Sequence, residues 1–168
     1  MKIAVKNFQE LSVEELYQIL RLRSEVFVVE QECIYQDMDG KDSLAVHILG
    51  MDDEKIIAYT RIFGPGDYYD QPCIGRVVVD KQRRGEEKGK EIMEVSIKYV
   101  KENYQNKEII LSAQKYLEKF YKDLGFFVEG DEYLEDGIPH QKMILKRNLE
   151  AEGAVLLEKA LLLLVNKY

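Results

Sequence analysis

An apolar run that leads straight into a basic turn is the most constraining feature of this 168-residue chain. The run is Val77-Val78-Val79, and a continuous β-branched run of this kind indicates a strand buried on both faces. Gly85 lies in the turn, and apolar side chains then recur at helical spacing from Met93 to Tyr104. Five cationic side chains lie in and just after the turn: Lys81, Arg83, Arg84, Lys88 and Lys90. The pattern predicts a strand, a tight turn and a helix in direct succession.

This predicted turn favours an anionic ligand. The first backbone N–H groups of a helix have no partner within the helix, and the helix dipole makes that end positive. A phosphate or pyrophosphate is the ligand that such a site suits, and Gly85 would let the backbone approach it closely. The same residues are equally consistent with an ordinary strand-to-helix turn whose charges are solvated, and the pattern alone leaves both interpretations open.

Hydrophobic periodicity predicts the rest of the fold. A capping box at Ser12 begins a first helix that continues through Arg23. Strands are expected at 44–49, 55–63, 74–79, 109–113, 126–129 and 140–146, and a short helix at 117–124 ends at Gly125. Because helices and strands alternate along the chain, we predict an α/β fold (α+β by some schemes) in which helices cover both faces of a mixed sheet.

Composition argues against several classes of function. The net charge is −7 and the pI is about 5.0, whereas nucleic acids and anionic membranes attract an excess of Lys and Arg. We therefore expect no nucleic-acid or membrane partner. Cys33 and Cys73 make no disulfide framework, which favours a cytoplasmic location. The only histidines, His47 and His140, lie far apart in the sequence, so we expect no metal site.

Two separated blocks resemble the GNAT (Gcn5-related) N-acetyltransferases. Residues 82–85, Gln-Arg-Arg-Gly, match the start of the family's Q/R-x-x-G-x-G/A motif, and Gly89 fits the longer R-G-x-G-x-G spacing. The last Gly/Ala of the short motif is Glu87 here, a side chain whose negative charge does not suit a pyrophosphate. Downstream, residues 111–114 and 120–126 resemble the family's later strand–helix motif, with Gln114 in place of the usual Asn.

Further blocks are similar to the ElaA-type subgroup of GNAT acyltransferases. They are residues 22–31, 35–39, 75–79 and 135–140. The resemblance covers about residues 8–147, and chance is a poor explanation for several separated blocks. It implies the GNAT acyl-CoA N-acyltransferase fold, a mixed and mostly antiparallel sheet flanked by helices, in a domain spanning residues 1–147.

The resemblance also implies a cosubstrate, acetyl-CoA, and the residues that would hold it. Backbone N–H groups of the turn would bind the pyrophosphate, a backbone N–H of Val78 or Val79 would polarise the thioester carbonyl, and Gln114 would lie near the cofactor. The implied cofactor-binding residues are Val77, Val78, Val79, Arg84, Gly85, Glu86, Glu87, Lys88, Gly89, Lys90 and Gln114.

Acetyl transfer to an amine makes two demands on proton transfer. The amine must lose its proton before it attacks, and the departing thiolate gains from being protonated. Tyr121 occupies the family's usual position for the general acid, although it also belongs to an apolar helical stripe and could be a packed core residue. For the base, His47 and His140 are the principal candidates, with Glu30 and Asp136 beside them. His47 lies on the opposite strand face from Val46 and Ile48, which would let it point toward the cleft, although a lone histidine in a strand is more often a structural residue. Proton transfer through water is the alternative to any single base.

The acceptor site is less constrained by sequence. The acidic stretch 30–42 could bind a cationic amine or could be a solvated loop. Arg23 and Arg76 are candidates for the acceptor side, or for ion pairs.

The pattern of the tail, residues 148–168, predicts a helix that is apolar around most of its circumference, so we expect it to pack on its own domain or across a homodimer interface.

Three functions therefore compete. The first is an acetyl-CoA-dependent N-acyltransferase that acts on an amine of a small molecule or a peptide. The second is a non-catalytic coenzyme A-binding module, which the departures at Glu87 and Gln114 favour. The third is a structural role in which the tail builds an oligomer. A fold alone does not fix a substrate, so the sequence leaves the acceptor unnamed.

Overall fold

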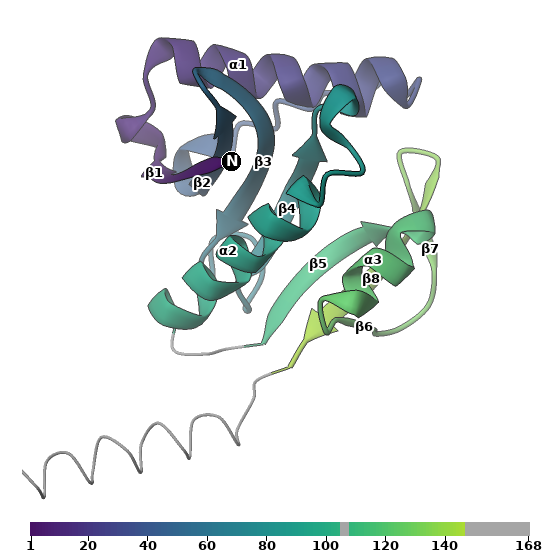
Figure 1. Ribbon diagram of the computed structural model, residues 1–168. Helices are drawn as coiled ribbons and strands as arrows, with labels where there is room; N and C mark the ends of the chain where they lie inside the picture. The colour runs from purple at the N-terminus through teal and green to yellow at the C-terminus, as the bar shows by residue number, and fades with distance from the viewer. Residues whose placement is uncertain (105–107, 147–168) are drawn as a thin grey trace, which may run out of the picture.

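The computed structural model describes residues 1–104 and 108–146, and these form a mixed sheet with helices against it (Figure 1). The strands are β1 Lys2–Asn7, β2 Val46–Asp52, β3 Lys55–Phe63, β4 Cys73–Val79, β5 Ile109–Gln114, β6 Phe127–Val128, β7 Tyr133–Glu135 and β8 Ile138–Leu145. The α-helices are α1 Val13–Arg23, α2 Lys88–Asn103 and α3 Glu118–Asp123. Shorter helical segments are η1 Phe8–Glu10, η2 Ser24–Glu30, η3 Asp42–Leu44, η4 Lys81–Arg83 and η5 Lys115–Leu117.

The sheet consists of two antiparallel halves that meet at one short parallel contact. The strand order is β1-β2-β3-β4-β5-β8-β6, and β7 pairs with β8. Every pairing is antiparallel except that of β4 with β5, which share a single register pair, Cys73 with Ile110. Beyond that pair the two strands diverge (Figure 1). The sheet therefore opens between the C-terminal ends of β4 and β5.

A bulge in β4 marks the same region. The register with β3 shifts between Tyr59, which opposes Val78, and Arg61, which opposes Gly75. Arg76 lies in the extra length of β4 with a φ of +50°. A bulge of this kind bends the strand and redirects its side chains, and it is common beside functional sites.

Helices cover both faces of the sheet, as the sequence predicted. On one face, α1 and η2 pack against the central strands through Ile19, Leu22 and Val26. On the other face, Met93 and Val100 of α2 belong to a second buried cluster. The run 77–79 divides between the two faces, because Val78 belongs to the first cluster while Val77 and Val79 pack against the second. Val77 and Val79 are only partly buried, since they also border a cavity.

The capping box predicted at Ser12 is present. The Ser12 hydroxyl accepts a hydrogen bond from the Glu15 amide at 3.1 Å, and the Glu15 carboxylate accepts one from the Ser12 amide at 2.8 Å. These bonds satisfy backbone donors that the first turn of a helix leaves free. They fix the start of α1, which continues directly into η2, a π-helical segment.

Several elements differ from the sequence prediction. β1 and β7 were not expected, because β1 is an edge strand without a fully buried residue and β7 is exposed throughout. Residue 44, placed in a strand by the sequence, lies in η3, and β2 begins at Val46. The predicted helical tail, residues 148–168, lies outside the described residues. Among residues 1–104 and 108–146, no helix is both long and apolar enough to cross a membrane.

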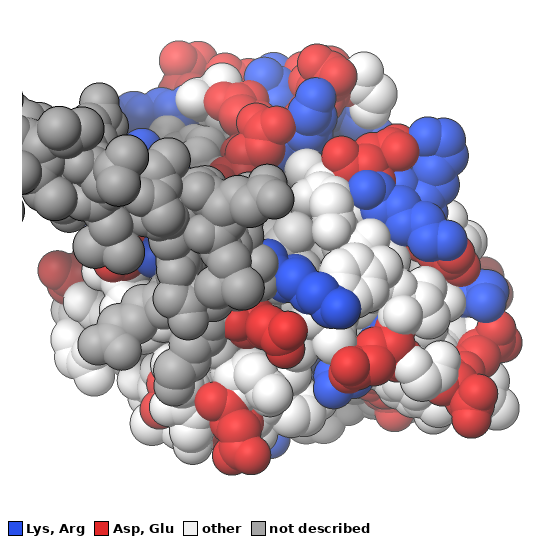
Figure 2. All heavy atoms as spheres, turned by 90° about the horizontal axis from the view of Figure 1, so that it is seen from below, with Lys and Arg blue, Asp and Glu red and all other residues white. Residues whose placement is uncertain are grey.

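Acidic and basic side chains lie side by side on the face drawn in Figure 2. Elsewhere in the described residues, exposed ion pairs include Lys98 with Glu102 on α2 and Lys142 of β8 with Glu129. Exposed pairs of this kind contribute little to stability individually, so they do not position the site.

Candidate functional site

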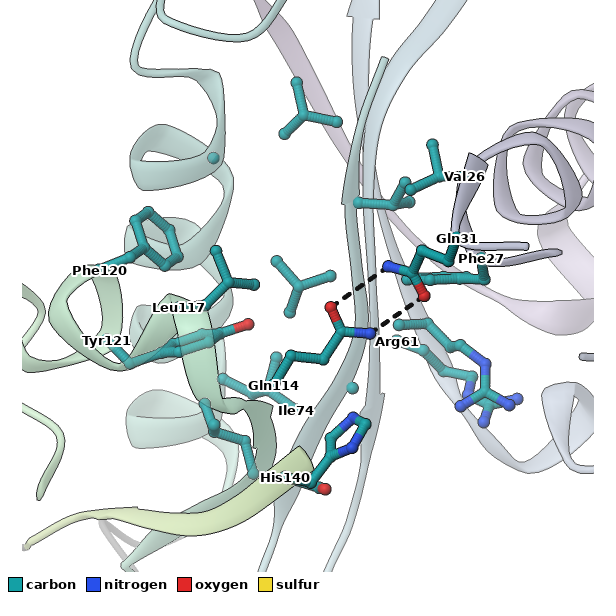
Figure 3. Close-up of a pocket in the computed structure, with 18 of the residues that line it drawn as sticks. Val26, Phe27, Gln31, Arg61, Ile74, Gln114, Leu117, Phe120, Tyr121 and His140 are labelled. Atoms are coloured by element: carbon teal, nitrogen blue, oxygen red, sulfur yellow. Dashed lines mark hydrogen bonds between the residues drawn. The ribbon is translucent and has the colours of Figure 1, made fainter. Parts of the chain in front are cut away.

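A cavity of about 940 Å³ occupies the opening between β4 and β5 (Figure 3). Its walls come from η2, β3, β4, the turn before α2, β5, α3 and β8. Of the residues that the resemblance assigned to the cofactor, Glu86 does not border the cavity. Ten do: Val77, Val78, Val79, Arg84, Gly85, Glu87, Lys88, Gly89, Lys90 and Gln114. Tyr121 and His140 border it as well, whereas His47 does not.

The turn between β4 and α2 forms one end of this cavity. Asp80 caps η4 by accepting a hydrogen bond from the Gln82 amide at 2.9 Å. Gly85 has a φ of +82°, and Glu87, the N-cap of α2, has a φ of +57°. The first hydrogen bond of α2 runs from the Glu91 amide to the Glu87 carbonyl at 3.0 Å. The amides of residues 88–90 precede that bond, so they have no acceptor within the helix.

The two arginines of the turn are held by carboxylates. Arg84 binds Glu30 at the end of η2 through two hydrogen bonds, Nη1 to Oε1 at 2.5 Å and Nη2 to Oε2 at 3.0 Å. Arg83 pairs with Asp52 of β2 and with Glu86. The hydrogen bonds from Arg84 lower the pKa of Glu30 below its usual value. Glu30 therefore stays ionised. It accepts hydrogen bonds from both terminal nitrogens of Arg84, the arginine that the family motif places in the turn.

Tyr121 lies on α3 and its hydroxyl points into the cavity beside Leu117 (Figure 3). The ring packs edge-to-face against Phe120, with centroids 5.0 Å apart, and the residue is only 4% exposed. Burial raises the pKa of Tyr121, and the neighbouring Tyr116 raises it further. The phenol is therefore protonated at neutral pH and can donate a proton.

A pair of amide side chains crosses the cavity. The Gln114 Nε2 donates to the Gln31 Oε1 at 3.0 Å, and the Gln31 Nε2 donates to the Gln114 Oε1 at 3.2 Å (Figure 3). Gln114 comes from the end of β5 and Gln31 caps η2. Gln31 was not among the sequence candidates, because nothing in its local pattern shows which residue lies opposite.

The two histidines have different surroundings. The His140 Nδ1 lies 2.8 Å from the Ile138 carbonyl and donates to it, so the neutral form of the ring has Nε2 as its acceptor. The ring stacks on Tyr133, with centroids 6.2 Å apart. His140 thus borders the cavity in a tautomer suited to accept a proton.

The expectation that His47 points toward the cleft is wrong. It is 0% exposed and is held from both sides. Its Nε2 donates to the Asp42 carbonyl at 3.0 Å, and its Nδ1 accepts from the Tyr59 hydroxyl at 2.7 Å. Burial lowers the pKa of His47, which keeps the ring neutral. The strand alternation placed this side chain on the opposite face from Ile48 correctly, but α1 and the loop before β2 cover that face.

The acidic stretch 30–42 is an ion-paired wall rather than a free acidic surface. Its aspartates bind three arginines through these pairs: Arg23 with Asp37 and Asp42, Arg61 with Asp39 and Asp42, and Arg76 with Asp37 and Asp39. Arg23 is completely buried and does not border the cavity, whereas Arg76 does. Arg61 was not a sequence candidate, although a charge within the apolar strand 55–63 signals a buried partner.

Aromatic side chains line the end of the cavity away from the turn. Phe63 stacks on Tyr68 at 5.4 Å between centroids, and Tyr68 meets Tyr69 edge-on at 4.6 Å. The Lys41 ammonium lies 4.1 Å from the centre of the Tyr68 ring. Burial raises the pKa of Tyr69 to about 12, with further contributions from its neighbours, Tyr133 and Glu135 among them. The loop after β3 and the hairpin of β7 and β8 line one part of the cavity together with His140, and we call this part the aromatic compartment.

Residues 8–147 match the family model described as an acetyltransferase (GNAT) domain. The chain belongs to the GNAT acetyltransferase family. Protein ElaA of Escherichia coli K12 is 43% identical over 136 residues, which cover 80% of this chain and 89% of ElaA. A UPF0039 protein of Schizosaccharomyces pombe is 37% identical, covering 87% of this chain and 97% of that protein.

Solved structures support the same assignment. The crystal structure of Escherichia coli ElaA matches this GNAT chain with a TM-score of 0.81 and 39% identity, over 86% of this chain and 99% of that one. An acyl-CoA N-acyltransferase from Pseudomonas aeruginosa matches with a TM-score of 0.80 and 37% identity, with the same coverage. The protein thus has the GNAT acyl-CoA N-acyltransferase fold, with an open and mostly antiparallel sheet.

Proposed function

We propose that this GNAT protein is an acetyl-CoA-dependent N-acyltransferase that moves the acetyl group to an amine of a small molecule or peptide by direct attack on the thioester. The observation that carries the proposal is that the Tyr121 hydroxyl and the turn that begins α2 border one continuous cavity. A general acid and a phosphate-binding turn in one cavity are what acyl transfer from a coenzyme A thioester requires.

The residues present fit acetyl-CoA as the first substrate. Amides of residues 88–90 would bind the pyrophosphate, and Arg84 would add a guanidinium, which binds phosphate with two N–H groups. The thioester arm would extend along residues 77–79, where a backbone N–H of Val78 or Val79 would polarise the carbonyl.

Two side chains would move protons during the transfer. The His140 Nε2 would accept the proton of the incoming ammonium, directly or through water. The amine nitrogen would then form a bond to the thioester carbonyl carbon, and it would lose its second proton to water as the carbon–sulfur bond breaks. Water would also return a proton to Tyr121 after the transfer. Tyr121 would donate its proton to the departing sulfur, because burial keeps the phenol protonated. The acceptor amine would enter from the aromatic compartment, where His140 stacks on Tyr133.

A second candidate is a module that binds coenzyme A, or builds a structure, without catalysis. Glu87 favours it, because a carboxylate at the N-cap of α2 repels a pyrophosphate. The engagement of Arg84 by Glu30 favours it as well.

Calorimetric titration with acetyl-CoA, followed by a thiol-release assay with a panel of amines, tests the proposal. We expect micromolar binding and amine-dependent release of free coenzyme A. Tyr121→Phe should keep the affinity for acetyl-CoA and lower the turnover about 100-fold. Binding without turnover, unchanged in Tyr121→Phe, would establish the non-catalytic module, and no binding at millimolar ligand would leave only the structural role.

A further inference from the structure

Glu30 and Gln31 are consecutive residues that bind two different walls of the cavity. Glu30 holds Arg84 of the turn, and Gln31 holds Gln114 of β5. Both stand at the end of η2, a π-helical segment that follows α1 without a break. Short π-helical segments within helices are frequent at functional sites. The end of η2 therefore ties the turn that begins α2 to the strand across the cavity.

The Arg84 side chain binds one carboxylate, that of Glu30, and in the proposed function it would also bind the pyrophosphate. Its guanidinium meets Glu30 in a two-bond geometry, which is the geometry in which arginine also binds phosphate. The pair is accessible, since the side chains are 41% exposed for Arg84 and 29% exposed for Glu30. A pyrophosphate at the turn and the Glu30 carboxylate would therefore compete for the same N–H groups.

Resting on the proposed function, we propose that Glu30 is exchanged between two cations. In the free protein it binds Arg84, and when the coenzyme's pyrophosphate takes Arg84, the released Glu30 carboxylate binds a second cationic group of the acceptor, apart from the amine that reacts beside His140. Glu30 is thus a specificity-determining residue for acceptors that carry such a second cation. It also lowers the affinity of the free protein for coenzyme A.

The position of Glu30 supports this exchange. It borders the cavity between the turn and the segment 31–41, whose Tyr35, Asp39 and Lys41 line the rest of that wall. The other cation that acts on Glu30 is Lys81, and Tyr116 lies close to both members of the pair. Asp37, Asp39 and Asp42 cannot take the role, because each is already bound to two arginines.

Binding of coenzyme A to the full-length protein tests the first half of the exchange. Glu30→Gln removes the competing charge, so we expect coenzyme A to bind about fivefold more tightly than to the wild type. Glu25→Gln is the matched control, because Glu25 is exposed on the same segment η2 and does not border the cavity. Equal affinities of wild type and Glu30→Gln would overturn the proposal.

A double-mutant cycle shows whether the effect acts through Arg84. In an Arg84→Gln background, Glu30→Gln should change the affinity for coenzyme A by less than twofold, since the pair no longer exists. The same fivefold gain in both backgrounds would mean that Glu30 acts only as a distant charge, and it would overturn the exchange.

Turnover tests the second half. At saturating acetyl-CoA, we expect Glu30→Gln to raise the KM for acceptors with a second cationic group about tenfold, while Glu25→Gln leaves that KM unchanged. A wild-type KM in Glu30→Gln would overturn the role in amine binding. If the wild type itself binds no coenzyme A or acetylates no amine, the proposed function fails, and that result differs from a failure of the exchange alone.

Discussion

Gln31 and Gln114 exchange two hydrogen bonds across the cavity, at 3.0 and 3.2 Å, although 83 positions separate them in the sequence. Each amide uses one donor and one acceptor on the other, so the pair is reciprocal. Both side chains are half-buried, and loss of one would leave the other without its partner in a partly dehydrated site. The pair is the direct link between η2 and the end of β5.

We expect Gln31→Ala and Gln114→Ala each to lower the free energy of unfolding by about 1 kcal/mol. Because both changes break the same two bonds, the double variant should lose less than the sum of the two single losses. Urea denaturation of the four proteins measures this coupling. Strictly additive losses would show that the pair contributes nothing to the stability of the fold.

The contrast between this pair and residues 77–90 shows how much a sequence can predict. The run 77–79, the turn at Gly85 and the helix after it are fixed by neighbouring residues, and the structure has all three. The family motif lies in the same stretch, so most residues it assigned to the cofactor do border the cavity. The contacts of Gln31 and Arg61 could be identified only once the fold was known, since their partners are distant in sequence.

The remaining differences between the sequence prediction and the structure arise from which side chains are buried. Alternation along β2 put His47 and Ile48 on opposite faces, which is correct, but it could not show that α1 covers the His47 face. β1 escaped prediction because an edge strand buries few side chains and its lysines break the apolar pattern. Local patterns predict which elements form, whereas the packing of one element on another decides which polar side chains reach the cavity.

The half-buried carboxylate of Asp42 provides a test of whether the ion pairs of residues 37–42 stabilise the fold. It accepts from the Arg23 Nη1 at 2.8 Å and from the Arg61 Nη1 at 2.7 Å. Burial by itself would raise the pKa of Asp42, but Arg23 and Arg61 outweigh that effect and lower the pKa. Asp42→Asn would leave two buried guanidinium groups short of a counter-charge, so we expect a loss of about 3–5 kcal/mol in the free energy of unfolding.

The control for this loss is Asp53→Asn, at an exposed turn position whose φ of +51° asparagine tolerates. It should change the free energy of unfolding by less than about 0.5 kcal/mol. Because the pKa of Asp42 is lowered in the folded protein, its contribution is present above the unfolded pKa and disappears as the pH falls through the folded pKa. Equal stability of Asp42→Asn and the wild type in urea at pH 7 would refute the structural role of this wall.

The two histidines should respond in opposite ways to the same substitution. His47→Gln removes a buried ring bonded on both sides, so we expect a loss of about 1–3 kcal/mol in the free energy of unfolding at pH 7. His140→Gln should change stability little and lower turnover about 100-fold, since His140 borders the cavity and, among the described residues, its Nε2 makes no hydrogen bond to the protein. Urea denaturation and the thiol-release assay on both variants check the contrast, and a turnover loss in His47→Gln alone would reverse the assignment.

His47 also predicts how stability depends on pH. Because burial lowers its pKa, the folded protein binds this proton less readily than the unfolded chain does. Stability from His47 is therefore present above its unfolded pKa of about 6.5 and is lost as the pH falls below that value. The stability difference between wild type and His47→Gln should narrow from pH 7 to pH 5.5. A difference that stays constant over this range would show that His47 carries the same charge in both states.

Glu87 combines two features at the N-cap of α2: a left-handed backbone with φ +57°, which strains a residue other than glycine, and a negative charge, which stabilises the helix but repels a pyrophosphate. Two substitutions separate them. Glu87→Gln removes only the charge, and Glu87→Gly removes the charge and the side chain that strains the backbone. Both should bind coenzyme A more tightly than the wild type, by about threefold to tenfold, whereas only Glu87→Gly should gain stability, by about 0.5–1 kcal/mol.

Calorimetric titration measures the affinity for coenzyme A, and thermal unfolding measures the stability independently. Unchanged affinity in both variants would show that the turn tolerates this carboxylate, and equal stability of the two variants would show that the left-handed conformation carries no strain.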